Sequence, residues 1–132
     1  MAHVLDACAL TAYFEKEPGY EKVQALLTAA ASGERTLFLS TVNWGEVHYV
    51  THRTHGFEQA DAIARIIGTF PIEIVDVDVE IARQAALFKV AHRLSYADCF
   101  AAALAKVKKS TLVTGDQEFK PLESQIKIAW LG

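Results

Sequence analysis

Short runs of apolar residues alternate along this chain with longer segments in which apolar residues recur every three or four positions. The short runs are typical of buried strands, and the longer periodic segments are typical of helices that pack one face on a core. The predicted strands are residues 3–5, 36–39, 71–75, 111–114 and 126–130, and the predicted helices are residues 7–16, 20–31, 41–54, 57–68, 79–93 and 95–108.

The alternation of strands and helices predicts an α/β protein with a mostly parallel sheet, because parallel strands need helical crossovers between them. The chain has 132 residues, no internal repeat and no linker, so we expect a single domain over residues 1–132. The 52% content of hydrophobic residues excludes a disordered chain.

No targeting or membrane segment is expected. The longest run without Asp, Glu, Lys or Arg, residues 23–33, has eleven residues, whereas a spanning helix needs about 20. The amino-terminal segment lacks the basic and apolar regions of a signal peptide. Two cysteines are too few for a disulfide framework and fit a reducing compartment, so we expect a cytoplasmic protein.

The charge balance restricts how the protein can bind nucleic acid. The chain has 13 Lys and Arg against 16 Asp and Glu, a net charge of −3. A protein that binds nucleic acid by neutralising phosphates alone is normally basic. Either nucleic acid is not the partner, or metal ions supply positive charge at the contact.

Two aspartates follow predicted strands directly. Asp6 follows the first strand and Asp116 follows the fourth, 110 positions later. The carboxyl ends of parallel strands meet at one edge of the sheet, where ligands bind, so the two side chains can converge. Each is also open to a simpler interpretation as a turn residue or helix N-cap.

Two further acids lie in apolar surroundings. Asp98 and Lys106 are the only charged residues of an otherwise apolar helix, and a buried carboxylate is unfavourable unless it is paired or bound to metal. A capping box with Ser95 is the alternative. Glu46 has largely apolar neighbours at helical spacing, and the preceding Gly45 predicts a close approach to the backbone there; alternatively, Glu46 reaches water at a boundary.

Together these acids predict a metal site. Four carboxylates within a few ångströms would drive one another to protonate, whereas Mg²⁺ or Mn²⁺ prefers such hard oxygen ligands. The four candidate residues are Asp6, Glu46, Asp98 and Asp116.

The segments around these acids resemble PIN-domain ribonucleases, most closely the VapC-type toxins of type II toxin–antitoxin systems. The resemblance covers the whole chain and is carried by Val-Leu-Asp6-Ala-Cys, Val-Asn-Trp-Gly-Glu46, Leu-Ser-Tyr-Ala-Asp98 and Leu-Val-Thr114-Gly-Asp116. Many members have Ser or Thr where this chain has Cys8. The resemblance implies a three-layer α/β/α sandwich, Mg²⁺- or Mn²⁺-dependent RNA cleavage and inhibition by a cognate antitoxin, through which any contact with DNA would be indirect.

The resemblance also implies roles for individual residues. Asp6, Asp98 and Asp116 would ligate the metal, and Glu46 would complete the ligand set or hold the attacking water. Thr114 would orient Asp6 or Asp116, with Cys8 beside them. The predicted contacts to flanking RNA phosphates are Arg53, Arg93 and Lys120.

Three alternatives remain open. The chain could be a non-catalytic binding module whose acidic pocket captures a basic peptide. His48, His52 and His55 lie on one predicted helical face and could bind zinc, although a surface or interface stripe explains them better because no further ligand is nearby. Aromatic residues could form antitoxin and homodimer contacts instead of core; these are Tyr13, Phe14, Trp44, Tyr49 and Phe57.

Overall fold

The computed structural model describes residues 1–132. It contains five strands, six α-helices and one 3₁₀ helix. In chain order they are β1 (Ala2–Leu5), α1 (Ala7–Glu15), α2 (Tyr20–Ala31), β2 (Thr36–Ser40), α3 (Thr41–His55), α4 (Phe57–Ile67), β3 (Glu73–Val75), α5 (Val79–Ala91), α6 (Tyr96–Val107), β4 (Thr111–Thr114), η1 (Gln117–Leu122) and β5 (Ile128–Trp130).

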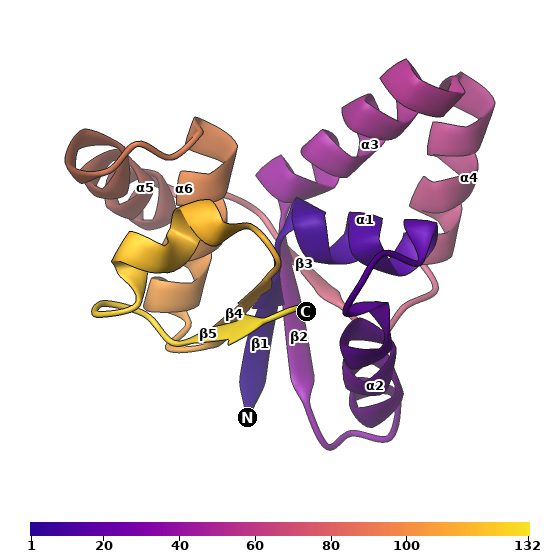
Figure 1. The fold of residues 1–132 in the computed structure, drawn as a ribbon, viewed down its shortest axis with the longest axis horizontal. Coiled ribbons are helices and arrows are strands. Elements are labelled where there is room, and N and C mark those ends of the chain that lie inside the picture. The colour runs from indigo at the N-terminus through magenta and orange to yellow at the C-terminus, as the bar shows by residue number, and fades with distance from the viewer.

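The five strands form one parallel sheet in the order β3-β2-β1-β4-β5 (Figure 1). The chain moves outward from β1 through β2 to β3, then returns to the other side of β1 and continues through β4 to β5. The order therefore reverses between β1 and β4. In open α/β sheets such a reversal forms a crevice at the carboxyl ends of the strands.

Side-chain alternation along the strands divides the core into two layers. Val4 and Leu112 face the layer that contains α5, α6 and η1. Leu5 and Val113 face the layer that contains α1 and α2, together with parts of α3 and α4. Because successive strand residues point to opposite faces, neighbouring apolar residues fill both layers. The expected three-layer α/β/α sandwich is confirmed.

Element boundaries differ from the sequence prediction where local hydrogen bonds compete with the sheet or helix. The Ile72 amide donates to the Phe70 carbonyl (2.8 Å), so residues 71–72 form a turn and β3 begins at Glu73. The Ile126 amide donates to the Leu122 carbonyl (3.0 Å), so Ile126 is not part of the sheet and β5 begins at Ile128. Helix α5 ends at Ala91 because His92 has an extended backbone.

None of the helices combines the length and the apolar character needed to cross a membrane. The α3–α4 pair projects beyond the sheet, whereas α6 lies against β1, β2 and β4 (Figure 1). This arrangement leaves the carboxyl ends of β1 and β4 between the α1–α3 side and the α6–η1 side of the molecule.

Candidate metal centre

Asp6 joins β1 to α1 at the centre of the sheet. It is the N-cap of α1, and its Oδ1 accepts a hydrogen bond from the Ala9 amide (2.7 Å). The side chain is almost fully buried, at 1% exposure, and Oδ2 has no hydrogen-bond partner of good geometry. The N-cap interpretation therefore accounts for one oxygen only. The second oxygen is buried without a hydrogen bond, although the Thr114 hydroxyl lies close enough to affect the pKa of Asp6.

The surroundings of Asp6 disfavour its negative charge. The pKa of Asp6 is raised from 3.8 to about 7, mainly by burial and also by the charges of Asp98 and Glu46, while the Thr114 hydroxyl and the Ala9 amide oppose the shift. A positive ion beside Oδ2 would offset this shift by stabilising the charged carboxylate.

Asp98 lies in the first turn of α6, the helix buried over Cys99–Ala105. Ser95 is the N-cap, and its Oγ accepts from the Asp98 backbone amide (3.2 Å). This bond uses the Asp98 main chain, and the Ser95 hydroxyl also lies close enough to the Asp98 carboxylate to affect its pKa. The pKa of Asp98 is raised to about 6, mainly by burial and also by the charges of Asp116, Glu46 and Glu118, while the Ser95 hydroxyl opposes the shift.

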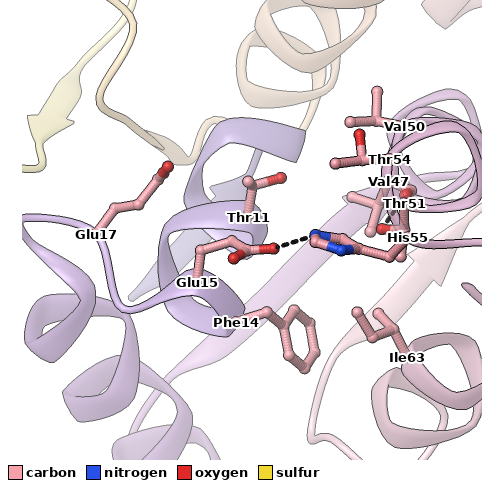
Figure 2. A pocket seen from close by; sticks show the side chains of 10 residues that line it. All are labelled: Thr11, Phe14, Glu15, Glu17, Val47, Val50, Thr51, Thr54, His55 and Ile63. Carbon is pink, nitrogen blue, oxygen red and sulfur yellow. Dashed lines mark hydrogen bonds and ion pairs between the residues drawn. The ribbon is translucent and has the colours of Figure 1, made fainter. Parts of the chain in front are cut away.

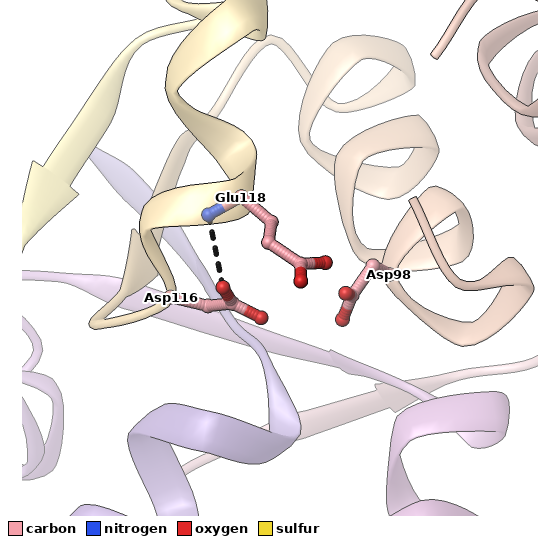
Figure 3. Close-up of side chains that lie close together, drawn as sticks. All are labelled: Asp98, Asp116 and Glu118. Atoms are coloured by element: carbon pink, nitrogen blue, oxygen red, sulfur yellow. Dashed lines mark hydrogen bonds between the residues drawn. The ribbon is translucent and has the colours of Figure 1, made fainter. Parts of the chain in front are cut away.

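Asp116 lies opposite Asp98, in the loop between β4 and η1 (Figure 3). Its backbone amide donates to Thr114 Oγ1 (3.0 Å), and its Oδ1 accepts from the Glu118 amide (2.9 Å). Thr114 is completely buried at the end of β4. Its hydroxyl therefore fixes the backbone of Asp116 and lies close enough to Asp6 to affect its pKa.

Three carboxylates from α6 and the β4–η1 segment converge. Asp98, Asp116 and Glu118 each offer an oxygen within 4.8 Å of the others, and Figure 3 shows their side chains pointing toward one another. Asp6 is outside this tight group, although its pKa is sensitive to the charge of Asp98. Asp6, Asp98 and Asp116 therefore lie at one edge of the sheet. Asp98 and Asp116 belong to the tight group, and Asp6 lies near it.

Glu46 is held by a buried amide. Asn43, one turn earlier on α3, is 0% exposed, and its Nδ2 donates to Glu46 Oε1 (3.3 Å) and to the Ala97 carbonyl (3.1 Å). Asn43 thereby connects α3 to the first turn of α6, beside Asp98. Its Oδ1 is buried without a partner. This is a second unpartnered oxygen close to the acidic cluster.

Replacing Asn43 should affect stability and the geometry of the site together. We expect Asn43→Ala to lower the free energy of unfolding by about 1–3 kcal/mol, because the Ala97 carbonyl loses its buried donor. Any activity that depends on Glu46 should fall about 10–100-fold. Urea denaturation and cleavage assays measure the two effects. Gln59→Ala, on exposed α4, is the control and should leave both unchanged.

The residues present fit a hard dication. The donors are carboxylate oxygens, two buried oxygens lack partners, and two carboxyl groups have raised pKa values that a cation would lower. Asp98, Asp116 and Glu118 can hold such an ion, with Asp6 adjoining them.

Cys8 is unsuited to nucleophilic chemistry. Its thiol is half-buried beside Gly115, where an added Cβ would lie 3.5 Å from Sγ. Burial raises the pKa of the Cys8 thiol to about 11, the charges of Asp6 and Asp116 add to this, and the Gly115 amide opposes it. The thiol is therefore protonated at neutral pH, and it packs against the loop that carries Asp116.

The predicted histidine stripe divides into two parts. His48 stacks on Trp44, with ring centroids 5.4 Å apart, and His48 and His52 both contact the Phe57 ring edge-on. His55 instead contacts Glu15 Oε1 on α1 (3.1 Å). The group of side chains that could hold a metal consists of Asp98, Asp116 and Glu118 and includes no histidine.

The other predicted aromatic contacts also divide. Tyr13 and Phe14 pack against Phe70, as core residues do, whereas Tyr49 and Phe57 are 53% and 57% exposed on the α3–α4 pair.

A groove of about 390 Å³ runs between α1 and α3 (Figure 2). Phe14, Val47, Val50 and Ile63 supply its apolar surface. Figure 2 shows Glu15 paired with His55 across it.

Two details were expected differently. Gly45 was predicted to allow a close approach to the backbone, but a Cβ added there would meet no atom within 4 Å. No other part of this chain approaches Gly45, so the prediction is wrong for contacts within the chain. Gly45 lies on an open part of α3. Arg53, Arg93 and Lys120 are all exposed, and Arg53 lies 5.3 Å from the centroid of the Tyr49 ring. Their contact with RNA stays a prediction.

Glu118 was not predicted. It lies in η1, a short 3₁₀ helix that has no helical periodicity in the sequence and contains Pro121. The available signal was its spacing, two residues after Asp116 and just beyond the carboxyl end of a strand. At that spacing, the Glu118 amide binds Asp116 and its side chain faces the same cluster.

The fold and this acidic edge define an α/β protein with a carboxylate-rich centre at the strand reversal. A family model described as PIN domain matches residues 3–123. The chain therefore belongs to the PIN-domain family. None of the curated protein sequences matches the chain.

Solved structures have the same architecture. The VapBC2 structure from Rickettsia felis, bound to a DNA fragment from its promoter, has a TM-score of 0.80, 19% identity and 100% coverage of both chains. Mycobacterium tuberculosis VapC20, described as a sarcin-ricin-loop-cleaving toxin, has a TM-score of 0.75, 17% identity and coverage of 94% of this chain and 95% of its own. DNA-bound VapBC from Salmonella typhimurium has a TM-score of 0.75, 18% identity and coverage of 98% and 97%.

Proposed function

We propose that this protein is a Mg²⁺- or Mn²⁺-dependent ribonuclease, the toxin of a toxin–antitoxin pair. The observation that carries the proposal is the convergence of Asp98, Asp116 and Glu118 from α6 and the β4–η1 segment, with Asp6 and Glu46 near enough for their charges to affect the pKa values of the site. Such a cluster is stable only when protonated or filled by a cation. The RNA-cleaving description of the similar Mycobacterium tuberculosis toxin supports RNA as substrate.

The acidic side chains hold the cation, and Glu46 acts on water. Asp6, Asp98 and Asp116, joined by Glu118, would bind Mg²⁺ or Mn²⁺. When bound, the ion neutralises charge on the phosphate and lowers the pKa of water. Glu46, whose Oε1 is fixed by Asn43, would orient the attacking water and accept its proton. Water attacks phosphorus and the bond to the 3′-oxygen breaks, giving a 5′-phosphate and a 3′-hydroxyl.

The α1–α3 groove is the surface we propose for a cognate antitoxin. Its apolar floor suits an amphipathic helix, and Glu15 and Glu17 at its side favour a basic one. The Rickettsia and Salmonella structures are complexes bound to DNA, which supports contact with DNA through the antitoxin. The exposed Tyr49 and Phe57 would contribute to antitoxin or homodimer contacts.

RNA digestion with and without chelator tests the proposal. The purified protein should cut single-stranded RNA in Mn²⁺ or Mg²⁺, lose this activity in EDTA and regain it when Mn²⁺ is restored in excess. Cleavage that continues in EDTA would contradict the metal-dependent mechanism. Binding of a basic peptide without RNA cleavage would instead favour a non-catalytic module.

Glu118 should contribute to metal affinity. We expect Glu118→Gln to weaken Mn²⁺ binding about thirtyfold, since a unit charge about 4 Å from a dication is worth about 2 kcal/mol in water. Isothermal titration with MnCl₂ measures this. Glu58→Gln, at an exposed position on α4, removes the same charge elsewhere and should leave the affinity unchanged. Equal affinities for both variants would exclude Glu118 from the site.

A further inference from the structure

One face of α3 runs outward from Glu46 and carries exposed side chains. At about 100° per residue, Tyr49 and Arg53 leave the helix within about 60° of Glu46. Tyr49 is 53% exposed and Arg53 is exposed. The groove against α1 is lined instead by residues such as Val47 and Thr51. Because α3 projects beyond the sheet (Figure 1), this face begins beside the acidic cluster and leads away from it.

Arg53 and Tyr49 form a pair on this face. The Arg53 guanidinium carbon lies 5.3 Å from the centroid of the Tyr49 ring, and Arg53 forms no salt bridge. Helical side chains lean toward the amino terminus of their helix, so Arg53 leans onto Tyr49 and Tyr49 leans back toward the turn that carries Glu46. A guanidinium without a carboxylate partner binds phosphate well, and exposed aromatic rings stack on nucleobases.

Gly45 lies one turn before Tyr49 on the same side of the helix. Glycine is unfavourable inside a helix, because it loses more conformational freedom than alanine. The backbone of Gly45 does not have the positive φ that would favour glycine. Packing does not require it either, because an added Cβ would meet no atom within 4 Å. The glycine therefore leaves bare backbone beside an exposed aromatic ring, where a flat group from another molecule can approach closely.

We propose that Gly45, Tyr49 and Arg53 form a subsite for single-stranded RNA, in which a nucleobase stacks on the Tyr49 ring over the bare Gly45 backbone and Arg53 binds a neighbouring phosphate. This subsite rests on the proposed ribonuclease function and extends it to a nucleotide beside the scissile bond. Tyr49 and Arg53 are positioning residues. Every base has a face that can stack, so the subsite holds RNA without selecting a sequence.

Two features favour RNA as the occupant. The face is continuous with the acidic cluster through Glu46, whose charge acts on both Asp6 and Asp98. Arg53 adds positive charge to an acidic chain on the same face of α3, where a flanking phosphate needs it. A protein partner that covers Tyr49 would exclude RNA from the subsite.

RNA binding to Asp98→Asn protein, which should leave RNA uncut, separates base from phosphate contacts. Fluorescence anisotropy compares labelled oligoadenylate with an abasic oligomer of equal length. Adding Tyr49→Ala should weaken oligoadenylate binding about tenfold and leave abasic binding unchanged, whereas Tyr49→Phe should bind both normally. Arg53→Met should weaken both equally and reduce the salt dependence by about one phosphate contact. Lys127→Met, an exposed position just before β5, is the charge control and should change neither.

Gly45→Gln distinguishes a binding role from a structural one. Glutamine is a much better helix former than glycine, so this variant should unfold at a higher urea concentration than the parent protein. Its side chain covers the bare backbone, so its affinity for oligoadenylate should fall about fivefold. A glycine that the fold requires would give the opposite change in stability. Unchanged RNA affinity in a stabilised Gly45→Gln protein would overturn the role of Gly45.

The remaining outcomes separate this subsite from the nuclease assignment. Undetectable oligoadenylate binding, or equal effects of Tyr49→Ala on both oligomers, would overturn the subsite. A change of Tyr49→Ala from dimer to monomer in sedimentation, with unchanged RNA affinity, would assign the face to contacts between copies of the chain. Metal-dependent cleavage by wild type with normal RNA binding by the Tyr49 and Arg53 variants would contradict the subsite alone. The expected binding differences without cleavage by wild type would contradict the nuclease assignment alone.

Discussion

Asp98→Asn should abolish RNA cleavage, with a loss of about a thousandfold or more, equivalent to about 4 kcal/mol of transition-state stabilisation. The substitution removes a charge that faces Asp116 and Glu118 in the cluster. It keeps the helix cap, because the Ser95 hydroxyl accepts from the Asp98 backbone amide, which the substitution leaves in place. Initial rates of cleavage of a labelled RNA measure the effect.

Asp61→Asn is the matched control for this experiment. Asp61 pairs with Arg65 on α4 (3.3 Å), half-exposed and outside the acidic cluster. This variant should cut RNA at the wild-type rate and at the same positions. If Asp98→Asn, free of contaminating nuclease and with a wild-type circular dichroism spectrum, cuts equally well, the catalytic assignment is wrong.

Metal-free protein should become less stable as the pH rises, and Asp6 should be the main cause. The pKa of Asp6 is about 7 in the folded chain, against 3.8 for the ordinary carboxyl group. Between these values the folded state binds more protons than the unfolded state, so the free energy of unfolding falls with increasing pH. If the full pKa shift acts, the free energy of unfolding falls by about 4 kcal/mol between pH 4 and pH 8. We expect a measured fall of about 2–4 kcal/mol.

Asp6→Asn should reduce this dependence to the smaller part that Asp98 causes. It should also keep the helix cap, because Asn is as good an N-cap as Asp. Urea denaturation in EDTA at pH 5 and pH 8 therefore compares the two proteins, and wild type should lose more stability than the variant. Mn²⁺ should stabilise wild type at pH 8 more than it stabilises Asp6→Asn, which keeps Asp98, Asp116 and Glu118 but lacks the Asp6 charge. If the free energy of unfolding changes with pH by the same amount in both proteins, the charge of Asp6 does not destabilise the folded state.

The fold could be predicted because the central strands β1, β2 and β4 are buried on both faces. Neighbours such as Val4 and Leu5 enter opposite core layers, so these strands are short apolar runs, distinct from the periodic helices. Strand ends were less predictable, since the turn at Phe70 and Ile72 depends on hydrogen bonds that hydrophobicity does not record.

The candidate site was predictable only where a charge contradicts its surroundings. Asp98 is conspicuous in an apolar helix, and Asp6 and Asp116 follow strands directly. Glu118 is exposed in a 3₁₀ helix, where an acid is unremarkable until Asp116 is seen beside it. The role of Asn43 depends on contact with Ala97, 54 positions later, which no local pattern reveals.

Diffraction from crystals soaked in MnCl₂, with data collected at the manganese edge, tests most directly whether the convergent acids form a dication site. We predict an anomalous peak bounded by oxygens of Asp98 and Asp116, with Asp6 or Glu118 beside it, and its loss in Asp98→Asn crystals. Ordered carboxylates with no anomalous peak among them, or manganese bound only elsewhere, would contradict the account.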